Sequence, residues 1–100
     1  MIPPMAITHD PEGHEIAALD ALVPILDGAQ IVEIGCGDGR LTRRYAHRAA
    51  SVLAIDPDET AIAVLRASPP DARVDIRAIG IDRLELADGS VDIVLLSWAL

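Results

Sequence analysis

The sequence predicts an α/β fold in which helices cover a mostly parallel sheet, and two observations predict it. Short apolar runs alternate with segments whose apolar residues recur at helical spacing, and this alternation is typical of βαβ units. The composition is 51% hydrophobic and 24% charged, so a packed core is expected. Aromatic residues make up only 2% of the chain, which leaves the core to aliphatic side chains. A chain of 100 residues has room for one domain.

The first third of the chain is predicted to contain a leader, a helix and a strand. Residues 1–13 hold three prolines and a glycine without a periodic apolar pattern, which predicts an irregular N-terminal leader. Residues 14–26 then show helical spacing, although Pro24 must kink or end this helix. Residues 30–34 are apolar apart from Glu33 and run directly into GCGDG, which predicts a buried strand that ends in a glycine turn.

The remaining elements follow the same alternation. A helix is expected over residues 39–48, and another is expected after Asp58, whose side chain can cap it. Residues 79–90 are too short for a crossover helix with its loops, so this stretch is expected to be mostly loop with at most one or two helical turns. Three further strands are expected, over residues 51–56, 72–78 and 91–96. Together with the first strand they form a parallel sheet with right-handed crossovers.

The charge and the single cysteine limit the partners and the compartment. The formal net charge is −8, and nucleic-acid binding depends on Lys and Arg at the phosphate backbone, so we expect no nucleic-acid partner. No apolar run reaches the roughly 20 residues of a membrane-spanning helix, and the start of the chain lacks the pattern of a signal peptide. Cys36 alone cannot form an internal disulfide. The predicted location is cytoplasmic, without membrane attachment.

The strongest functional signal is the glycine-rich sequence VEIGCGDG at residues 32–39. It lies at a strand-to-helix junction, where glycines let the chain turn tightly and bring bare backbone against a ligand. A nucleotide-type cofactor is therefore implied. The dinucleotide fingerprint requires a third glycine three residues after the second, and this position is Arg40. The glycines follow Glu33 instead at every second position.

This E-x-G-x-G-x-G arrangement resembles the first motif of class I S-adenosylmethionine-dependent methyltransferases. The resemblance implies a Rossmann-like three-layer sandwich, of which residues 14–100 would be the cofactor-binding front part with about four of the family's seven strands. In that family the glycine turn passes under the amino-acid part of S-adenosylmethionine. The acidic residue helps to order the loop and, directly or through water, the ammonium group. The resemblance gives these places to Glu33, Gly35, Cys36 and Gly37.

A second motif of the family is matched at the end of the next predicted strand. Asp56 stands there, where a carboxylate can accept hydrogen bonds from both ribose hydroxyls. The resemblance also implies that Pro57 offers an apolar face near the adenine. Taken alone, Asp-Pro is more often a strand end or a helix cap, but its position relative to the glycine loop favours the cofactor role.

A third motif is matched in part by AIGIDRLELADGSVDIV, residues 78–94, which resembles a pattern of methyltransferases that act on small molecules. The acidic residue usual early in that motif falls on Gly80, so backbone groups around Ile81 and Asp82 would contact the adenine amino group. Asp82 as a solvated loop carboxylate is the equal alternative. Ser97 follows the last strand, at the edge where ligands of open α/β sheets bind, and its backbone would flank the methionine portion.

The predicted function is methyl transfer from S-adenosylmethionine to a small-molecule acceptor. Alignment of donor and acceptor supplies much of the rate of such a reaction, and no catalytic residue and no metal site are nominated. Two alternatives stay open. One is a non-catalytic binding module or a subunit completed by a partner chain, and the other is an NAD-binding oxidoreductase fragment, which Arg40 disfavours.

The strand expected over residues 91–96 predicts a further property. With four strands it would be an unprotected sheet edge, which favours self-association or pairing with a partner chain. A truncated reading frame, or a fragment completed by a partner, is the expected explanation.

Overall fold

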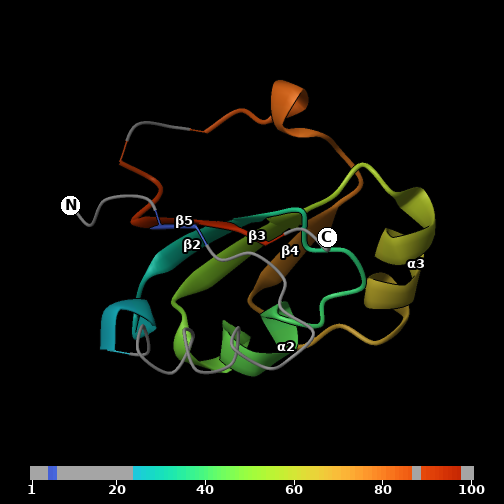
Figure 1. Cartoon of the computed structure of the whole chain (residues 1–100). Coiled ribbons are helices and arrows are strands. Elements are labelled where there is room, and N and C mark those ends of the chain that lie inside the picture. Colours follow the sequence, from blue (N-terminus) through green and yellow to red (C-terminus); the bar gives the residue numbers. More distant parts are fainter. Residues whose placement is uncertain (1–4, 7–23, 87–88, 98–100) are drawn as a thin grey trace.

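The computed structural model describes residues 5–6, 24–86 and 89–97. In this part of the chain, parallel strands form a five-stranded sheet in the order β1-β5-β2-β3-β4 (Figure 1). The strands are β1 (Met5–Ala6), β2 (Gln30–Ile34), β3 (Ser51–Ile55), β4 (Val74–Arg77) and β5 (Ile93–Leu96). The predicted α/β fold with a parallel sheet is confirmed.

Helices cover one face of this sheet (Figure 1). Residues 24–26 are helical. The other helical elements are α2 (Thr42–Tyr45), the 3-10 turns η1 (Ala46–Arg48) and η2 (Ile81–Arg83), and α3 (Glu59–Ala67). Among the described residues, the extended segments on either side of η2 pack on the opposite face, through Ile79, Leu84 and Val91. The three-layer arrangement is therefore incomplete, as expected.

The central strand, β2, is buried on both faces. Ile31 packs in the core beneath the helices, whereas Val32 and Ile34 belong to a second cluster on the opposite face, because successive side chains of a strand point to opposite sides. Burying each of these side chains contributes about 1.5–3 kcal/mol. The register with β3 pairs Ile34 with Ile55, so the two strands end level with each other. Their following loops leave the sheet at the same edge.

Helix boundaries follow from two local features. The helix expected over residues 39–48 is confined to α2 and η1, because Gly39 has a φ of +89°, in the left-handed region that a helix excludes. Asp58 caps α3 as predicted. Its Oδ1 accepts hydrogen bonds from the backbone nitrogens of Thr60 and Ala61, at 3.0 and 3.1 Å.

The prediction of a free edge at the strand near the end of the chain is wrong. β5 lies between β2 and β1, and Met5–Ala6 runs in parallel register with Leu95 and Leu96. Two residues of the predicted irregular leader therefore form a strand, because the open backbone groups of β5 gain hydrogen-bonding partners there. The rest of residues 1–13 and the predicted helical residues 14–23 lie outside the described residues. Within the described chain, β1 and β4 are the outer strands.

Candidate cofactor-binding site

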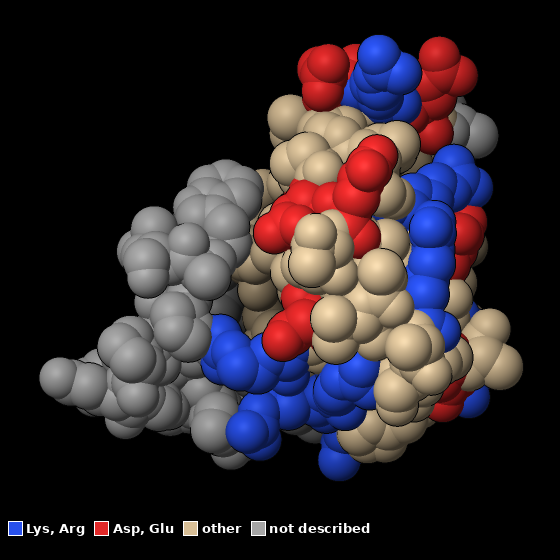
Figure 2. Space-filling model, turned by 90° about the vertical axis from the view of Figure 1, so that its right-hand side faces the viewer, with Lys and Arg blue, Asp and Glu red and all other residues tan. Residues whose placement is uncertain are grey.

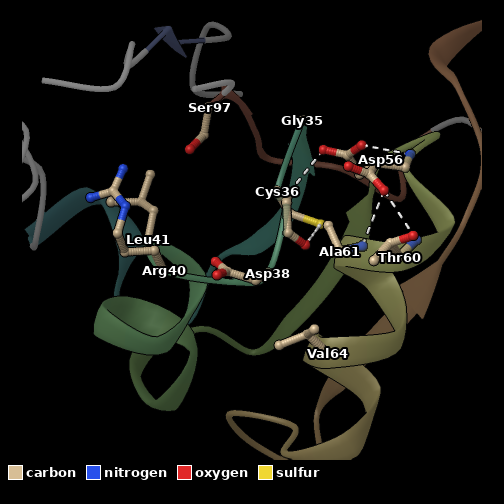
Figure 3. Close-up of a pocket in the computed structure, with 12 residues that line it drawn as sticks. Gly35, Cys36, Asp38, Arg40, Leu41, Asp56, Thr60, Ala61, Val64 and Ser97 are labelled. Carbon is tan, nitrogen blue, oxygen red and sulfur yellow. Dashed lines mark hydrogen bonds between the residues drawn. The ribbon is translucent and has the colours of Figure 1, made fainter. Parts of the chain in front are cut away.

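A cavity of about 610 Å³ lies at the carboxyl edge of the sheet (Figure 3). Pockets that hold small-molecule ligands have volumes of roughly 300–1,000 Å³, and ligands of open α/β sheets bind at this edge. Its walls come from the loop after β2, the region between β3 and α3, and the end of β5. The lining residues are Gly35, Cys36, Gly37, Asp38, Arg40, Leu41, Asp56, Asp58, Thr60, Ala61, Val64 and Ser97.

The loop after β2 is fixed to the end of β3 by backbone hydrogen bonds. The backbone nitrogens of Gly35 and Cys36 both donate to the carbonyl oxygen of Ile55, at 2.9 and 3.1 Å. The backbone nitrogen of Gly39 donates to the carbonyl oxygen of Cys36 at 3.0 Å, which closes a tight turn inside the loop. The course of the loop is thus set by the protein's own backbone.

Glycine is required at two positions of this loop for different reasons. Gly37 has a φ of +57° and lines the cavity, and an added Cβ there would meet no atom within 4 Å. Its bare backbone is open to a ligand. Gly39 also has a positive φ, and an added Cβ would overlap Cδ1 of Leu65. Gly39 therefore lets α3 pack closely against the loop.

Asp56 joins the glycine loop to the start of α3. Its Oδ2 accepts a hydrogen bond from the backbone nitrogen of Gly37 at 2.9 Å, and its Oδ1 accepts one from the backbone nitrogen of Asp58 at 2.8 Å. Figure 3 shows this carboxylate at one end of the cavity. Each carboxylate oxygen can accept a further hydrogen bond, so the pair can still receive ligand hydroxyls. The structure brings Asp56 to the glycine loop, as the sequence predicted.

Glu33 lies behind the loop and is not part of the cavity wall. It is fully buried, and its Oε1 accepts hydrogen bonds from Thr42 Oγ1 at 2.7 Å and from the Tyr45 hydroxyl at 2.6 Å. Burial, and then the Glu33 carboxylate, hold the pKa of Tyr45 well above its usual value of 10.0, so the hydroxyl keeps its proton. These bonds tie β2 to α2 across the loop. The contact of Glu33 with a cofactor ammonium group stays a prediction.

Cys36 is a neutral thiol in the cavity wall. The residue is 6% exposed, and its Sγ donates to the carbonyl oxygen of Gly37 at 3.6 Å. Burial, and then the nearby carboxylates of Glu33 and Asp56, raise the pKa of the Cys36 thiol to about 12. Because the thiolate is the nucleophilic form of cysteine, this residue does not act as a nucleophile near neutral pH.

The described residues that line the cavity carry an excess of negative charge. Three carboxylates, those of Asp38, Asp56 and Asp58, line it together with the guanidinium of Arg40. Figure 2 shows acidic side chains gathered in the centre of the face on which α3 lies, with Arg side chains below and beside them. A cleft lined mainly by one sign of charge concentrates ligands of the opposite sign. The electrostatics therefore favour a cationic ligand over a phosphorylated one.

Within residues 5–6, 24–86 and 89–97, no group of three or more His, Cys, Asp or Glu residues is placed to hold a metal ion. No helix of this same part of the chain has the length and the apolar character needed to cross a membrane.

Besides Glu33, three of the predicted cofactor residues lie outside the cavity wall. Pro57 is exposed in the bend after β3. Ile81 is 62% exposed on η2, and the carboxylate of Asp82 folds back on Gly80, where an added Cβ would lie 2.7 Å from its Oδ1. The segment is held away from the cavity because its neighbour Leu84 packs on the opposite face of the sheet. The cofactor roles of Pro57, Ile81 and Asp82 stay predictions.

Ser97 fits the prediction more closely. It is 8% exposed at the end of β5, lines the cavity, and its backbone nitrogen donates to the carbonyl oxygen of Ile34 at 2.8 Å. Sequence reasoning missed the first turns of α3, which supply Thr60, Ala61 and Val64. Their spacing places them on one side of a helix that starts at the ligand-binding edge, and this signal could have identified them.

The fold and the site define a class of protein. An open parallel sheet carries a glycine loop after its central strand, and a carboxylate after the adjacent strand lies beside that loop. This is the arrangement of Rossmann-like domains that bind a nucleotide-type cofactor.

A family model described as "Methyltransferase domain" matches residues 32–100, and the chain belongs to this family of S-adenosylmethionine-dependent methyltransferases. A ubiquinone biosynthesis O-methyltransferase of Rhizobium rhizogenes is 40% identical over 72 residues, which cover 70% of this chain and 29% of that relative. A Mycobacterium tuberculosis protein named "Probable S-adenosylmethionine-dependent methyltransferase" is 38% identical over 74 residues, 74% of this chain and 26% of the relative.

Solved structures agree with this assignment. The crystal structure of an S-adenosylmethionine-dependent methyltransferase from Mesorhizobium loti matches with a TM-score of 0.70 and 34% identity. The match covers 82% of this chain and 38% of that one. The chain therefore spans less than a third of the length of the curated relatives described above and less than half of this solved chain.

Proposed function

We propose that this chain binds S-adenosylmethionine in the cavity at the carboxyl edge of the sheet and serves methyl transfer to a small-molecule acceptor. The observation that carries the proposal is the hydrogen bond between Gly37 and Asp56. It places an open glycine backbone and a carboxylate with spare acceptor capacity in one cavity. These are the two groups that the amino-acid part and the ribose of the cofactor require.

The lining residues supply the contacts that such a cofactor needs. In the proposal, the backbone of Gly35 to Gly37 and the region of Ser97 flank the methionine portion. Asp56 accepts hydrogen bonds from the ribose hydroxyls, and the apolar atoms of Ala61 and Val64 on α3 take the place beside the adenine that the sequence assigned to Pro57. Glu33 acts from behind by fixing α2 against the loop.

The charge of the cavity supports S-adenosylmethionine over a dinucleotide. The sulfonium and the ammonium group of S-adenosylmethionine are cationic, and Asp38, Asp56 and Asp58 lower the free energy of such a ligand. The diphosphate of NAD would meet the same three carboxylates and be repelled. The acidic wall is thus a second argument against a dinucleotide cofactor. The first is that Arg40 stands where the dinucleotide motif requires glycine.

The chain's own contribution to the reaction is binding and orientation. When bound, S-adenosylmethionine supplies an electrophilic methyl group on a sulfonium that is already a good leaving group. The loop after β2 is anchored to Ile55 and Asp56, so it holds its backbone groups in fixed positions. Such fixed positions align a donor with an acceptor, which accounts for much of the acceleration of a two-reactant step. The similarity to a relative named for ubiquinone biosynthesis supports a small-molecule acceptor.

Calorimetric titration of the full chain with S-adenosylhomocysteine tests this proposal. We expect saturable binding that Asp56→Ala weakens at least about tenfold, since a hydrogen bond to a charged group contributes about 1.5–3 kcal/mol. NADH is the comparison ligand, and we expect no heat of binding from it.

Asp75→Ala is the matched control, because Asp75 is an exposed carboxylate on β4 that pairs with Arg77 outside the cavity. It should bind S-adenosylhomocysteine like the wild type. Equal affinity in the Asp56→Ala and wild-type chains would contradict the ribose role of Asp56. A folded wild-type chain without affinity for S-adenosylhomocysteine would contradict the proposal as a whole.

A further inference from the structure

We propose that the outer side of α2 and η1 is a docking surface for an acidic peptide segment of a partner protein. This inference goes beyond the proposed function, because none of the residues involved lines the cofactor cavity. Tyr45 and Ala46 of these two elements are buried in the core. The docking surface, which we call the basic face, consists of the four exposed side chains on either side of them, those of Arg43, Arg44, His47 and Arg48.

The basic face differs in charge from the chain as a whole. The formal net charge is −8, with 16 acidic and 8 basic residues. No Asp or Glu stands between Asp38 and Asp56, whereas this stretch holds four of the eight arginines. Figure 2 shows basic side chains gathered on the lower side of the molecule, where α2 lies in Figure 1, apart from the acidic group in the centre. A ligand that meets this face therefore experiences a positive local potential on an acidic protein.

Two arginines of the basic face keep most of their hydrogen-bonding capacity. Arg43 Nη1 donates to the carbonyl oxygen of Ser68 at 2.6 Å, which uses one of the five donors of a guanidinium and does not neutralise its charge. Arg48 Nη1 lies 3.4 Å from Oδ1 of Asp27, and the two side chains are 43% and 58% exposed. Such an exposed ion pair contributes little stability, so it can exchange for another. Both guanidinium groups can therefore pair with carboxylates of a partner.

The backbone beneath the basic face is fixed along its length. Two hydroxyl groups of α2 donate to Glu33 on β2. The guanidinium of Arg73 donates to the carbonyl oxygens of His47 and Ala49, at 3.1 and 2.8 Å, and thereby holds η1. A partner thus meets side chains on a preformed backbone, and only their rotamers need to be ordered on binding.

Shape and charge favour an acidic peptide over other anions. The basic face is the outer side of a helical segment, and such a convex surface does not enclose a small molecule. Arg44 and Arg48 lie about one helical turn apart, and carboxylates at the same spacing on a peptide helix match them. A nucleic acid or a membrane is a continuous polyanion that extends beyond these few charges, and the excess of acidic residues elsewhere on the chain repels it. The four side chains of the basic face also include no apolar one that could enter a bilayer.

Fluorescence anisotropy with two labelled peptides tests the proposal on the full chain. One peptide consists of Ala and Glu, with Glu residues four positions apart, and the other has Gln in place of Glu. We expect the chain to bind the Glu peptide at low ionic strength and to lose this affinity at roughly 0.5 M salt, where the screening length falls to about 4 Å. The Gln peptide should not bind. Arg44→Gln combined with Arg48→Gln should weaken the Glu peptide at least about threefold, because two ion pairs are lost.

Arg77→Gln combined with Arg83→Gln is the matched control, because it removes the same charge from exposed residues on β4 and η2. It should keep most of the wild-type affinity. Circular dichroism verifies that each variant is folded, and Arg44→Gln alone serves if the double variant is not.

Equal losses in the two folded double variants, or equal binding of the two peptides, would overturn the proposal. Tighter binding of the wild type to single-stranded DNA or to phosphatidylglycerol vesicles than to the Glu peptide would also overturn it, since the partner would then be of another class. The titrations contain no cofactor, so their outcome is independent of the proposed function.

Discussion

Two loops leave the same edge of the sheet, and they differ in how they are held. The loop of residues 35–41 after β2 is tied by backbone hydrogen bonds to Ile55 and by a carboxylate bond to Asp56. The segment of residues 78–86 after β4 has turn bonds within η2, including Arg83 N to Gly80 O at 3.1 Å, and it packs on the far face of the sheet. Only the first loop forms the cavity wall.

This difference explains why the first loop, and not the second, can form a binding site. A loop that shares hydrogen bonds with the adjacent strand keeps its backbone groups in fixed positions, which a ligand can use without an ordering cost. A loop that is held through apolar contacts on the opposite face lacks these hydrogen bonds, so its backbone is not fixed at the ligand-binding edge. The predictions below test whether the anchoring of the first loop, and not its motif alone, makes the site.

The largest effect is expected at the buried carboxylate behind the first loop. Glu33→Ala removes the acceptor of the Thr42 and Tyr45 hydroxyls, which lie in the core at 0% exposure. Two buried donors left without this acceptor, together with the cavity created, should lower the free energy of unfolding by about 3–5 kcal/mol. Urea denaturation followed by circular dichroism measures the change.

Glu33→Gln is the comparison, because both hydroxyls donate to the single oxygen Oε1 and the amide oxygen of Gln can still accept both bonds. This variant should lose clearly less stability. The loss of these hydrogen bonds in Glu33→Ala should also lower the affinity of the folded fraction for S-adenosylhomocysteine, since α2 is no longer fixed to β2. A stable Glu33→Ala chain with wild-type affinity would show that the loop is anchored by its backbone bonds alone.

A second test separates the two reasons for glycine within the anchored loop. Gly39→Ala places a side chain at a positive φ and against Leu65, which should cost about 2–4 kcal/mol of stability in total. Gly37→Ala also has a positive φ but meets no atom within 4 Å, so it should cost about 1–2 kcal/mol and act mainly on ligand affinity. Thermal denaturation and calorimetry of both variants distinguish the effects. Equal stabilities would show that α3 can move away from the loop.

The sequence predicted the anchored loop, and for the second loop it predicted a mostly irregular backbone with a short helical turn, observed as η2, but not the face on which this loop packs. The strand of residues 30–34 and the cap at Asp58 depend on local patterns, and both are observed with the expected bounds. The position of Asp56 beside Gly37 follows from parallel neighbouring strands that end level. The packing of residues 79–86 depends instead on which face of the sheet offers apolar contacts, and no local pattern encodes this.

The pairing of β1 is a second feature that sequence reasoning missed. A strand of two residues, Met5–Ala6, is too short for any periodic signal, and its place beside Leu95 and Leu96 is a contact between distant parts of the chain. The charge of the cavity was missed in a similar way. No local pattern around Asp38 and Arg40 indicated a cavity shared with Asp56, because only the folded loop brings these residues together.

A third prediction concerns alkaline pH and the anchored loop. The folded pKa values of Cys36 and Tyr45 are both raised, the first from 9.0 to about 12, so the folded state holds these protons more tightly than the unfolded chain does. Their contribution to stability is complete below pH 9 and is lost as the pH rises toward 12. The slope approaches about 1.4 kcal/mol per pH unit for each group.

The chain is suited to this measurement because it contains no Lys. In the unfolded chain, Cys36 and Tyr45 are therefore the only side chains that titrate between pH 9 and 12. Urea unfolding at a series of pH values should show a shallower alkaline loss in Cys36→Ala than in the wild type. Identical slopes would mean that the thiol is already solvated in the folded loop, against its burial in the structure.

The smallest effect is expected in the second loop. Asp82 is exposed on η2, and its carboxylate folds back on Gly80, outside the cavity. Asp82→Asn should therefore change both stability and the affinity for S-adenosylhomocysteine by less than about 0.5 kcal/mol, as a surface substitution does. Asp56→Asn is the same chemical change beside the anchored loop, and in parallel titrations it should lower the affinity for S-adenosylhomocysteine severalfold. If Asp82→Asn instead weakens binding as much as Asp56→Asn, the segment of residues 78–86 closes on the ligand, and the two loops contribute equally to the site.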